Sequence, residues 1–350
     1  MRTIVHFGMS KSGSTALQKG LSRARESLLE QGILYPRAPI IPHSHNLLMA
    51  GLVPPGDLPR FVRHSLKRAG ETPDLCDSWL GTVGEACARD GVRTLVFSAE
   101  NLWGLSGPAP AALLRKKLQG IGATRIEAVA YLRRPSDWYL SMAGQVLVAS
   151  HAIKPAATIP YRPAIEAVVG HLADPGAVRL HVYDRARFPE GDILAHFATD
   201  MLEGATLPDA APRDANVTLS AEGMDLLRNY RLHAHPRENA KFTRDTRHFL
   251  DALKQAEQAT PGHARPRLYD DIARKIDHGA PDLLWLREVH GLAFEGIDYE
   301  AIETGPWRKN FNRIDRLCPV DPARLDRLRD RVIEELATAL ESATRRRKKG

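Results

Sequence analysis

The chain has 350 residues, of which 43% are hydrophobic, and a formal net charge of +7. It is long enough to bury a sizeable core in one large domain or two ordinary ones, and its hydrophobic fraction is that of an ordinary soluble globular protein. Five positive charges belong to Arg345, Arg346, Arg347, Lys348 and Lys349, and without them the net charge falls to +2. The net charge without these five residues excludes a strongly basic folded domain.

The ends and the cysteines predict a cytoplasmic protein. The start, MRTIVHFG, reads as a strand and leaves no room for a signal peptide, and no apolar run is long enough to span a membrane. Cys76, Cys87 and Cys318 are odd in number and lack metal-type spacing, which favours reduced thiols. The basic tail at 343–350 is expected to be disordered and solvated, rather than an arm for specific nucleic acid.

The first half of the chain predicts an α/β fold. Short apolar or β-branched runs predict strands over 3–7, 94–98, 126–132 and 178–183. Helical spacing recurs in Leu17, Leu21, Ala24 and Leu28, and also over 78–89, 110–118, 138–148 and 165–172. This alternation is typical of βαβ units, so we expect three α/β/α layers around a central parallel sheet.

The pattern changes after about residue 205. Strand-like runs stop, and helical segments are predicted over 220–233, 246–258, 267–277, 281–294 and 322–340. The proline-rich ATLPDAAPRD marks the seam. We therefore expect a single domain over 1–342, with an α/β core at 1–205 and a helical C-terminal part at 206–342.

The stretch IVHFGMSKSGSTALQKGL at 4–21 is typical of an anion-binding loop. The strand runs into Gly8, the loop ends at Gly13, and an amphipathic helix begins near Ser14 or Thr15. Backbone N–H groups and the positive end of a helix dipole then surround one point, and Lys11 adds a charge. The alternative is a glycine-bearing turn with an exposed lysine and no ligand.

A triphosphate P-loop is a second alternative for this stretch. Its pattern is a glycine, four residues, then glycine, lysine and serine or threonine. Here Lys11 precedes the second glycine, Gly13, and no lysine follows it. The sequence therefore departs from the ATPase and GTPase pattern.

GMSKSGSTALQ resembles the 5′-phosphosulfate loop of sulfotransferases that use 3′-phosphoadenosine 5′-phosphosulfate (PAPS), in which the lysine also precedes the second glycine. Threonine is frequent in that family where this chain has Ser12 and Ser14. The resemblance implies a P-loop-like sulfotransferase fold of the bacterial type. It also implies a 5′-phosphosulfate site formed by Ser10, Lys11, Ser12, Gly13, Ser14 and Thr15.

A second stretch, YLRRPSDWYLS, follows the strand expected at 126–132. Arg133 closes that strand, Pro135 breaks the run, and a helix carries Ser141 one turn or more further on. The sulfotransferase family has a strand-closing arginine followed eight residues later by a helical serine, a separation that Arg133 and Ser141 share. The resemblance therefore implies that these two residues bind the 3′-phosphate of PAPS.

Sulfuryl transfer depends on positioning and on charge stabilisation, which Lys11 would supply without a metal ion. The acceptor must also lose a proton, and two candidate bases stand out. Glu100 follows the strand expected at 94–98 and would lie at the same sheet edge as Lys11 and Arg133; alternatively it only favours a helix start. His45, in PHSHNLL, is the second candidate, or else a structural loop histidine.

The resemblance predicts a transferase that moves the sulfuryl group of PAPS to a hydroxyl or amine and releases 3′,5′-ADP. The acceptor stays open among glycans, lipids, small molecules and peptides, and so does the oligomeric state. Two alternatives stay open as well. One is a P-loop-related kinase, and the other is a non-catalytic protein that binds a nucleotide or a polyanion.

Overall fold

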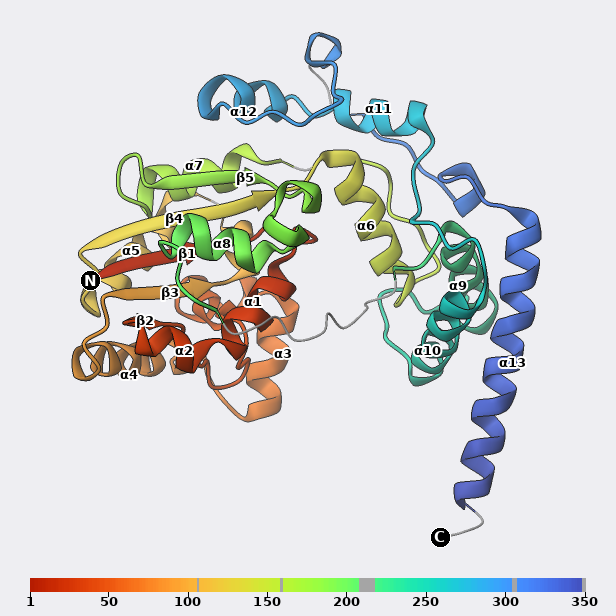
Figure 1. The fold of residues 1–350 in the computed structure, drawn as a ribbon, viewed down its shortest axis with the longest axis horizontal. Coiled ribbons are helices and arrows are strands. Elements are labelled where there is room, and N and C mark those ends of the chain that lie inside the picture. The colour runs from red at the N-terminus through yellow and green to blue at the C-terminus, as the bar shows by residue number, and fades with distance from the viewer. Residues whose placement is uncertain (106, 158–159, 208–217, 304–306, 348–350) are drawn as a thin grey trace. The chain divides into compact units, whose positions relative to one another are not determined.

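The structure is a computed structural model that describes residues 1–105, 107–157, 160–207, 218–303 and 307–347 (Figure 1). The chain forms two compact units. Unit 1 contains Met1–Arg134, Pro160–Pro212 and Asp282–Glu295, and unit 2 contains Pro135–Ile159, Arg213–Pro281 and Gly296–Gly350. The units interleave along the chain, whereas the sequence analysis placed one boundary at residue 205.

A five-stranded parallel sheet lies at the centre of unit 1. The strands are β1 (Arg2–His6), β2 (Ile33–Leu34), β3 (Thr94–Ser98), β4 (Arg125–Leu132) and β5 (Val178–Val182). They run in the order β2-β3-β1-β4-β5, and every neighbouring pair is parallel. The predicted α/β class with a parallel sheet is confirmed, and the many helices are consistent with the expected three layers.

The helices of unit 1 are α1 (Ser14–Arg23), α2 (Arg25–Glu30), α3 (Arg60–Ala69), α4 (Leu75–Arg89), α5 (Pro108–Gly120), α7 (Arg162–His171), α8 (Ile193–Met201) and α12 (Asp282–His290). The sequence analysis did not predict α3, α8 or the two-residue β2. Two short 3₁₀ helices, η1 (Asn46–Gly51) and η3 (Glu100–Gly104), also lie in this unit.

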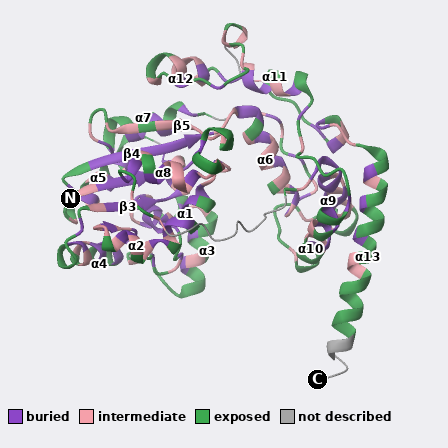
Figure 2. Ribbon diagram, viewed as in Figure 1, coloured by how far each residue is buried: buried purple, intermediate pink, exposed green. Residues whose placement is uncertain are grey.

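The sheet is buried by apolar residues that alternate along its strands. Ile4, Val96 and Val129 pack with Leu17 and Leu21 of α1, and the core continues onto α8. The intervening strand residues are buried as well, namely Val5, Phe97 and Ala130. Figure 2 shows β1, β3 and β4 mostly in the colour of buried residues, whereas β5 is only partly buried. The central strands β1, β3 and β4 are therefore covered on both faces, as is usual in a parallel sheet.

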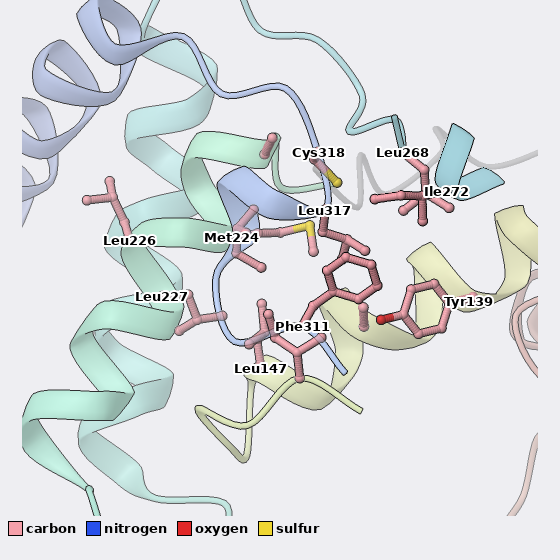
Figure 3. Close-up of a cluster of buried hydrophobic side chains, with 14 of the residues drawn as sticks. Tyr139, Leu147, Met224, Leu226, Leu227, Leu268, Ile272, Phe311, Leu317 and Cys318 are labelled. Carbon is pink, nitrogen blue, oxygen red and sulfur yellow. The ribbon is translucent and has the colours of Figure 1, made fainter. Parts of the chain in front are cut away.

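Unit 2 is built from α6 (Pro135–Leu147), α9 (Ala221–Ala234), α10 (Arg244–Ala259), α11 (Asp270–His278) and α13 (Pro322–Arg347). Figure 3 shows the centre of its core, where Tyr139 and Leu147 of α6 face Met224 and Leu227 of α9, together with Phe311. The helix α13 continues to Arg347, so the prediction of a disordered tail is wrong for 343–347; residues 348–350 lie outside the described residues.

A buried ion-pair network ties three segments of unit 2 together. Arg324 donates to the Ser220 hydroxyl at 2.7 Å, to Glu222 at 2.9 Å and to Glu257 at 2.6 Å. All of these side chains are buried. The network therefore joins the N-terminus of α13 to α9 and α10.

We expect Arg324→Leu to lower the free energy of unfolding by about 3 kcal/mol, because it leaves two buried carboxylates without their cation. Urea unfolding measures the change. The matched control is Arg329→Leu, which breaks the exposed pair with Asp326 on the same helix and should cost less than about 1 kcal/mol. Equal losses in the two variants would contradict this role of Arg324.

Candidate anion-binding and transfer site

Three predicted site residues follow three adjacent strands. Lys11 follows β1, Glu100 follows β3, and Arg133 follows β4 directly. Because β1 lies between β3 and β4 and all three run parallel, their carboxyl ends meet at one edge of the sheet, where ligands of such sheets bind. The hydrogen bond from Ala99 N to His6 O, 2.9 Å long, fixes the register at that edge.

The loop after β1 is closed by its own serines. The buried hydroxyl of Ser12 donates to the Met9 carbonyl at 2.6 Å, and that of Ser14 lies 3.4 Å from the same oxygen. Lys11 has a positive φ of 64°, a conformation that costs a non-glycine residue energy. Thr15 is exposed at the start of α1. The loop therefore holds Lys11 in one backbone state just before a helix N-terminus.

Gly8 gives this loop room to fold back on the strand. A Cβ atom at Gly8 would lie 2.4 Å from the Ser14 hydroxyl oxygen and 2.8 Å from Cε1 of His6. His6 is fully buried, and its Nδ1 lies 2.7 Å from the Ser98 hydroxyl. Burial lowers the pKa of His6 to about 3, so the ring is neutral beneath the loop.

Gly13 is the residue at which the loop becomes α1, and it is packed against Tyr183. Its φ of 84° is left-handed, and a Cβ atom there would lie 2.5 Å from the Tyr183 ring. Tyr183 directly follows β5, and its N–H donates to Leu132 O at 2.7 Å. The sequence analysis included Tyr183 only as the end of a strand and missed its contact with the loop.

We expect Gly13→Ala to abolish high-affinity anion binding at the loop and to destabilise unit 1 by more than about 1 kcal/mol. The added methyl group meets an aromatic ring, and alanine disfavours a positive φ. Thermal unfolding measured with and without 3′,5′-ADP checks both effects. Gly56→Ala is the control, since no atom lies within 4 Å of a Cβ there. Wild-type behaviour of Gly13→Ala would contradict the required geometry.

Arg133 connects the end of β4 to the loop. Its Nη1 donates to the carbonyl of Lys11 at 2.9 Å, and its Cζ lies 5.9 Å from the centre of the Tyr183 ring. The buried Tyr161 donates its hydroxyl to the Arg133 carbonyl at 2.6 Å. The guanidinium is therefore held at the loop, where its charge favours an anion.

The side chains of Lys11 and Glu100 influence one another electrostatically. Burial lowers the pKa of Lys11. The charge of Glu100 opposes this lowering, and the charge of Arg133 adds to it. Burial raises the pKa of Glu100, and the charge of Lys11 opposes this rise. Among the described residues, neither side chain forms a hydrogen bond or a close ion pair. A half-buried cation and carboxylate without close partners fit a site that binds an anion and accepts a proton.

His45 occupies a different environment. It is fully buried, its Nδ1 accepts a hydrogen bond from Ser98 N at 2.8 Å, and its Nε2 lies 2.7 Å from the Pro36 carbonyl. Burial lowers the pKa of His45 to about 3. Since both ring nitrogens are engaged, the geometry supports the structural alternative for His45, and we no longer assign it the role of base.

The predicted pair of Arg133 and Ser141 is divided between the units. Arg133 lies in the first segment of unit 1, next to its last residue, and Ser141 lies on α6 of unit 2. The N-terminus of α6 is fixed within its own unit by Asp277 of α11, which accepts hydrogen bonds from the backbone N–H and the hydroxyl of Ser136. The joint role of Arg133 and Ser141 stays a prediction.

Comparisons with known proteins add no identity to this site. No protein-family model matches the chain, and neither the curated proteins nor the solved structures contain a match. Within the described residues, no cluster of three or more histidine, cysteine or acidic side chains is arranged to hold a metal ion. The same part of the chain contains no helix that is long and apolar enough to cross a membrane.

Proposed function

We propose that the chain is a PAPS-dependent sulfotransferase that acts in the cytoplasm. The observation that carries the proposal is the edge of the sheet where the lysine-bearing loop after β1 lies between the strand ends that carry Glu100 and Arg133. The position of Lys11 before Gly13 distinguishes this loop from a triphosphate P-loop and matches the phosphosulfate loop that it resembles.

In the proposed reaction, the 5′-phosphosulfate of PAPS binds at the loop with its sulfuryl group toward Lys11. The loop N–H groups and the N-terminus of α1 bind the phosphate oxygens, and the 3′-phosphate binds at Arg133 with the predicted help of Ser141. Lys11 interacts electrostatically with Glu100, so its charge would stabilise the ionised base as well as the departing phosphate.

The chemical step is an in-line displacement at sulfur. The acceptor oxygen or nitrogen forms a bond to sulfur while the bond between sulfur and the phosphate oxygen breaks. The electron pair of that bond stays on the phosphate oxygen of 3′,5′-ADP. The acceptor proton passes to the carboxylate of Glu100, whose raised pKa makes it a better proton acceptor than an exposed glutamate.

Ligand-dependent thermal unfolding tests the proposal. We expect 3′,5′-ADP to stabilise the protein, by about 2.7 kcal/mol at a concentration 100 times its Kd, and ATP with magnesium to have no comparable effect. Stabilisation by ATP with magnesium alone would instead favour a kinase. No stabilisation by either ligand would contradict a nucleotide site at this loop.

Turnover of PAPS in the presence of acceptors then tests catalysis. Wild-type protein should form 3′,5′-ADP in proportion to the sulfated acceptor, because the displacement releases one for each transfer. Binding of 3′,5′-ADP without turnover, across hydroxyl and amine acceptors of the glycan, lipid, peptide and small-molecule classes, would support the non-catalytic alternative.

A further inference from the structure

The helix α3 presents an exposed basic face that the proposed reaction leaves without a role. Its sequence is RFVRHSLKRA and contains no acidic residue. Val62 and Leu66 are buried, whereas the cationic side chains and the histidine are exposed, namely those of Arg60, Arg63, His64, Lys67 and Arg68. At about 100° per residue these five positions share one continuous face, which is roughly 12 Å long. Phe61, 57% exposed, borders this face.

The basic face works against the stability of its own helix. Arg63 lies in the first turn of α3, where a positive charge opposes the helix dipole, and that turn contains no acidic residue. Arg63 and Lys67 are four residues apart, so they repel one another. Among the described residues, Arg63, Lys67 and Arg68 form no ion pair. Cations in the first turn of a helix and like charges four residues apart both destabilise a helix, so a sequence that keeps them indicates a function such as ligand binding.

The position of α3 connects it to the candidate site. The 3₁₀ helix η1 packs against both α3 and η3, and η3 begins with Glu100. Asn46 at the start of η1 accepts a hydrogen bond from Asn101 N at 3.0 Å, next to that glutamate. Figure 1 shows α1 and α3 at the end of unit 1 toward which the strands point. The packing therefore links α3, through η1, to the segment that carries Glu100.

We infer that the basic face of α3 binds the acceptor, and that this acceptor is an acidic polysaccharide. This inference rests on the proposed function. A face about 12 Å long with several cations suits a chain with repeated negative charges rather than a small molecule. Each sugar of such a chain also carries free hydroxyl groups that can accept the sulfuryl group, whereas most hydroxyl groups of a nucleic acid are esterified. Phe61 offers an apolar surface for a sugar ring.

The packing of α3 disfavours a membrane as the ligand. A helix that lies in a bilayer surface buries its own apolar face among the lipids. In α3 that face, formed by Val62 and Leu66, is already buried in unit 1. Only Phe61 remains to enter a bilayer.

Polymer binding by the full chain tests the inference, with polygalacturonate as the acidic polysaccharide. We expect the triple variant Arg63→Ala, Lys67→Ala and Arg68→Ala to bind polygalacturonate about tenfold more weakly, with a shallower salt dependence. A control triple variant, Lys116→Ala, Arg244→Ala and Arg247→Ala, removes three exposed charges elsewhere and should change the affinity less than twofold. The α3 variant should unfold at the same temperature as wild type or higher.

Three results would overturn the inference. The first is equal affinity of the α3 variant and the wild type for polygalacturonate. The others are tighter binding of wild type to phosphatidylserine vesicles, or to oligothymidylate, than to polygalacturonate. Stabilisation by 3′,5′-ADP is measured on the same proteins. If the wild type lacks that stabilisation, the proposed function fails. If 3′,5′-ADP still stabilises the wild type and only the polymer result fails, the α3 inference alone is wrong.

Discussion

Replacing Lys11 with methionine lowers the rate of sulfuryl transfer from PAPS by about 10³-fold or more, since it removes the cation that stabilises charge on the phosphate as the bond to sulfur breaks. Methionine keeps an unbranched side chain at a position where φ is 64°, so the loop backbone is preserved. The rate at saturating PAPS, measured with an acceptor that wild type sulfates, checks this result.

Two further measurements separate charge from folding in that experiment. Lys19→Met removes a lysine from the exposed side of the helix α1 and should keep the wild-type rate. Lys11→Met should weaken the binding of 3′,5′-ADP far less than it lowers the rate, because the loop N–H groups and Arg133 still bind its phosphates. Full activity of Lys11→Met would refute the assigned role of Lys11.

Replacing Glu100 with glutamine lowers the rate by about 10² to 10⁴-fold, the usual contribution of a general base. Glutamine has nearly the same shape but cannot accept the proton, so the affinity for 3′,5′-ADP should stay within a few-fold of wild type. Glu85→Gln, on the exposed face of α4, is the matched control. If glutamine at position 100 preserved the rate, the base would have to be another group.

The pH dependence of the rate gives Glu100 a second signature. Burial raises its pKa, and the reaction needs its ionised form, so the rate should rise with pH through a value above that of an ordinary glutamate. The charge of Lys11 opposes this shift. Residual activity of Lys11→Met should therefore rise at higher pH than that of wild type. Coincident pH profiles would contradict electrostatic coupling between the two side chains.

The sheet was predictable because its strands carry local signals. β1, β3 and β4 consist mostly of buried residues, many of them apolar, and β5 is a short run that begins and ends with valine. Each of these four strands was expected within two residues of its observed bounds. The strand Ile33–Leu34 is too short for any alternation to be visible, and it exists because β3 pairs with it. The helix α3 was missed because most of its residues are polar, with only Val62 and Leu66 buried.

The contacts of the site were less predictable than its residues. Nothing local to His45 indicates that Ser98 and Pro36 engage both of its nitrogens. Tyr183 also lies 170 residues from Gly13 in the chain, and only the closing of β5 beside β4 brings its ring to the loop. Long-range contacts of this kind depend on the strand order, which sequence patterns do not encode.

The sequence by itself determined that this chain has a parallel α/β core and a loop in which Lys11 precedes Gly13, because strand runs, glycines and charges act over a few neighbouring residues. The tertiary structure decided that β1 lies between β3 and β4, which places Glu100 and Arg133 beside that loop. It also decided that His45 is buried and that α3 displays its cations. These outcomes depend on which segments pack together, since burial and electrostatic environment arise only when distant parts of the chain meet.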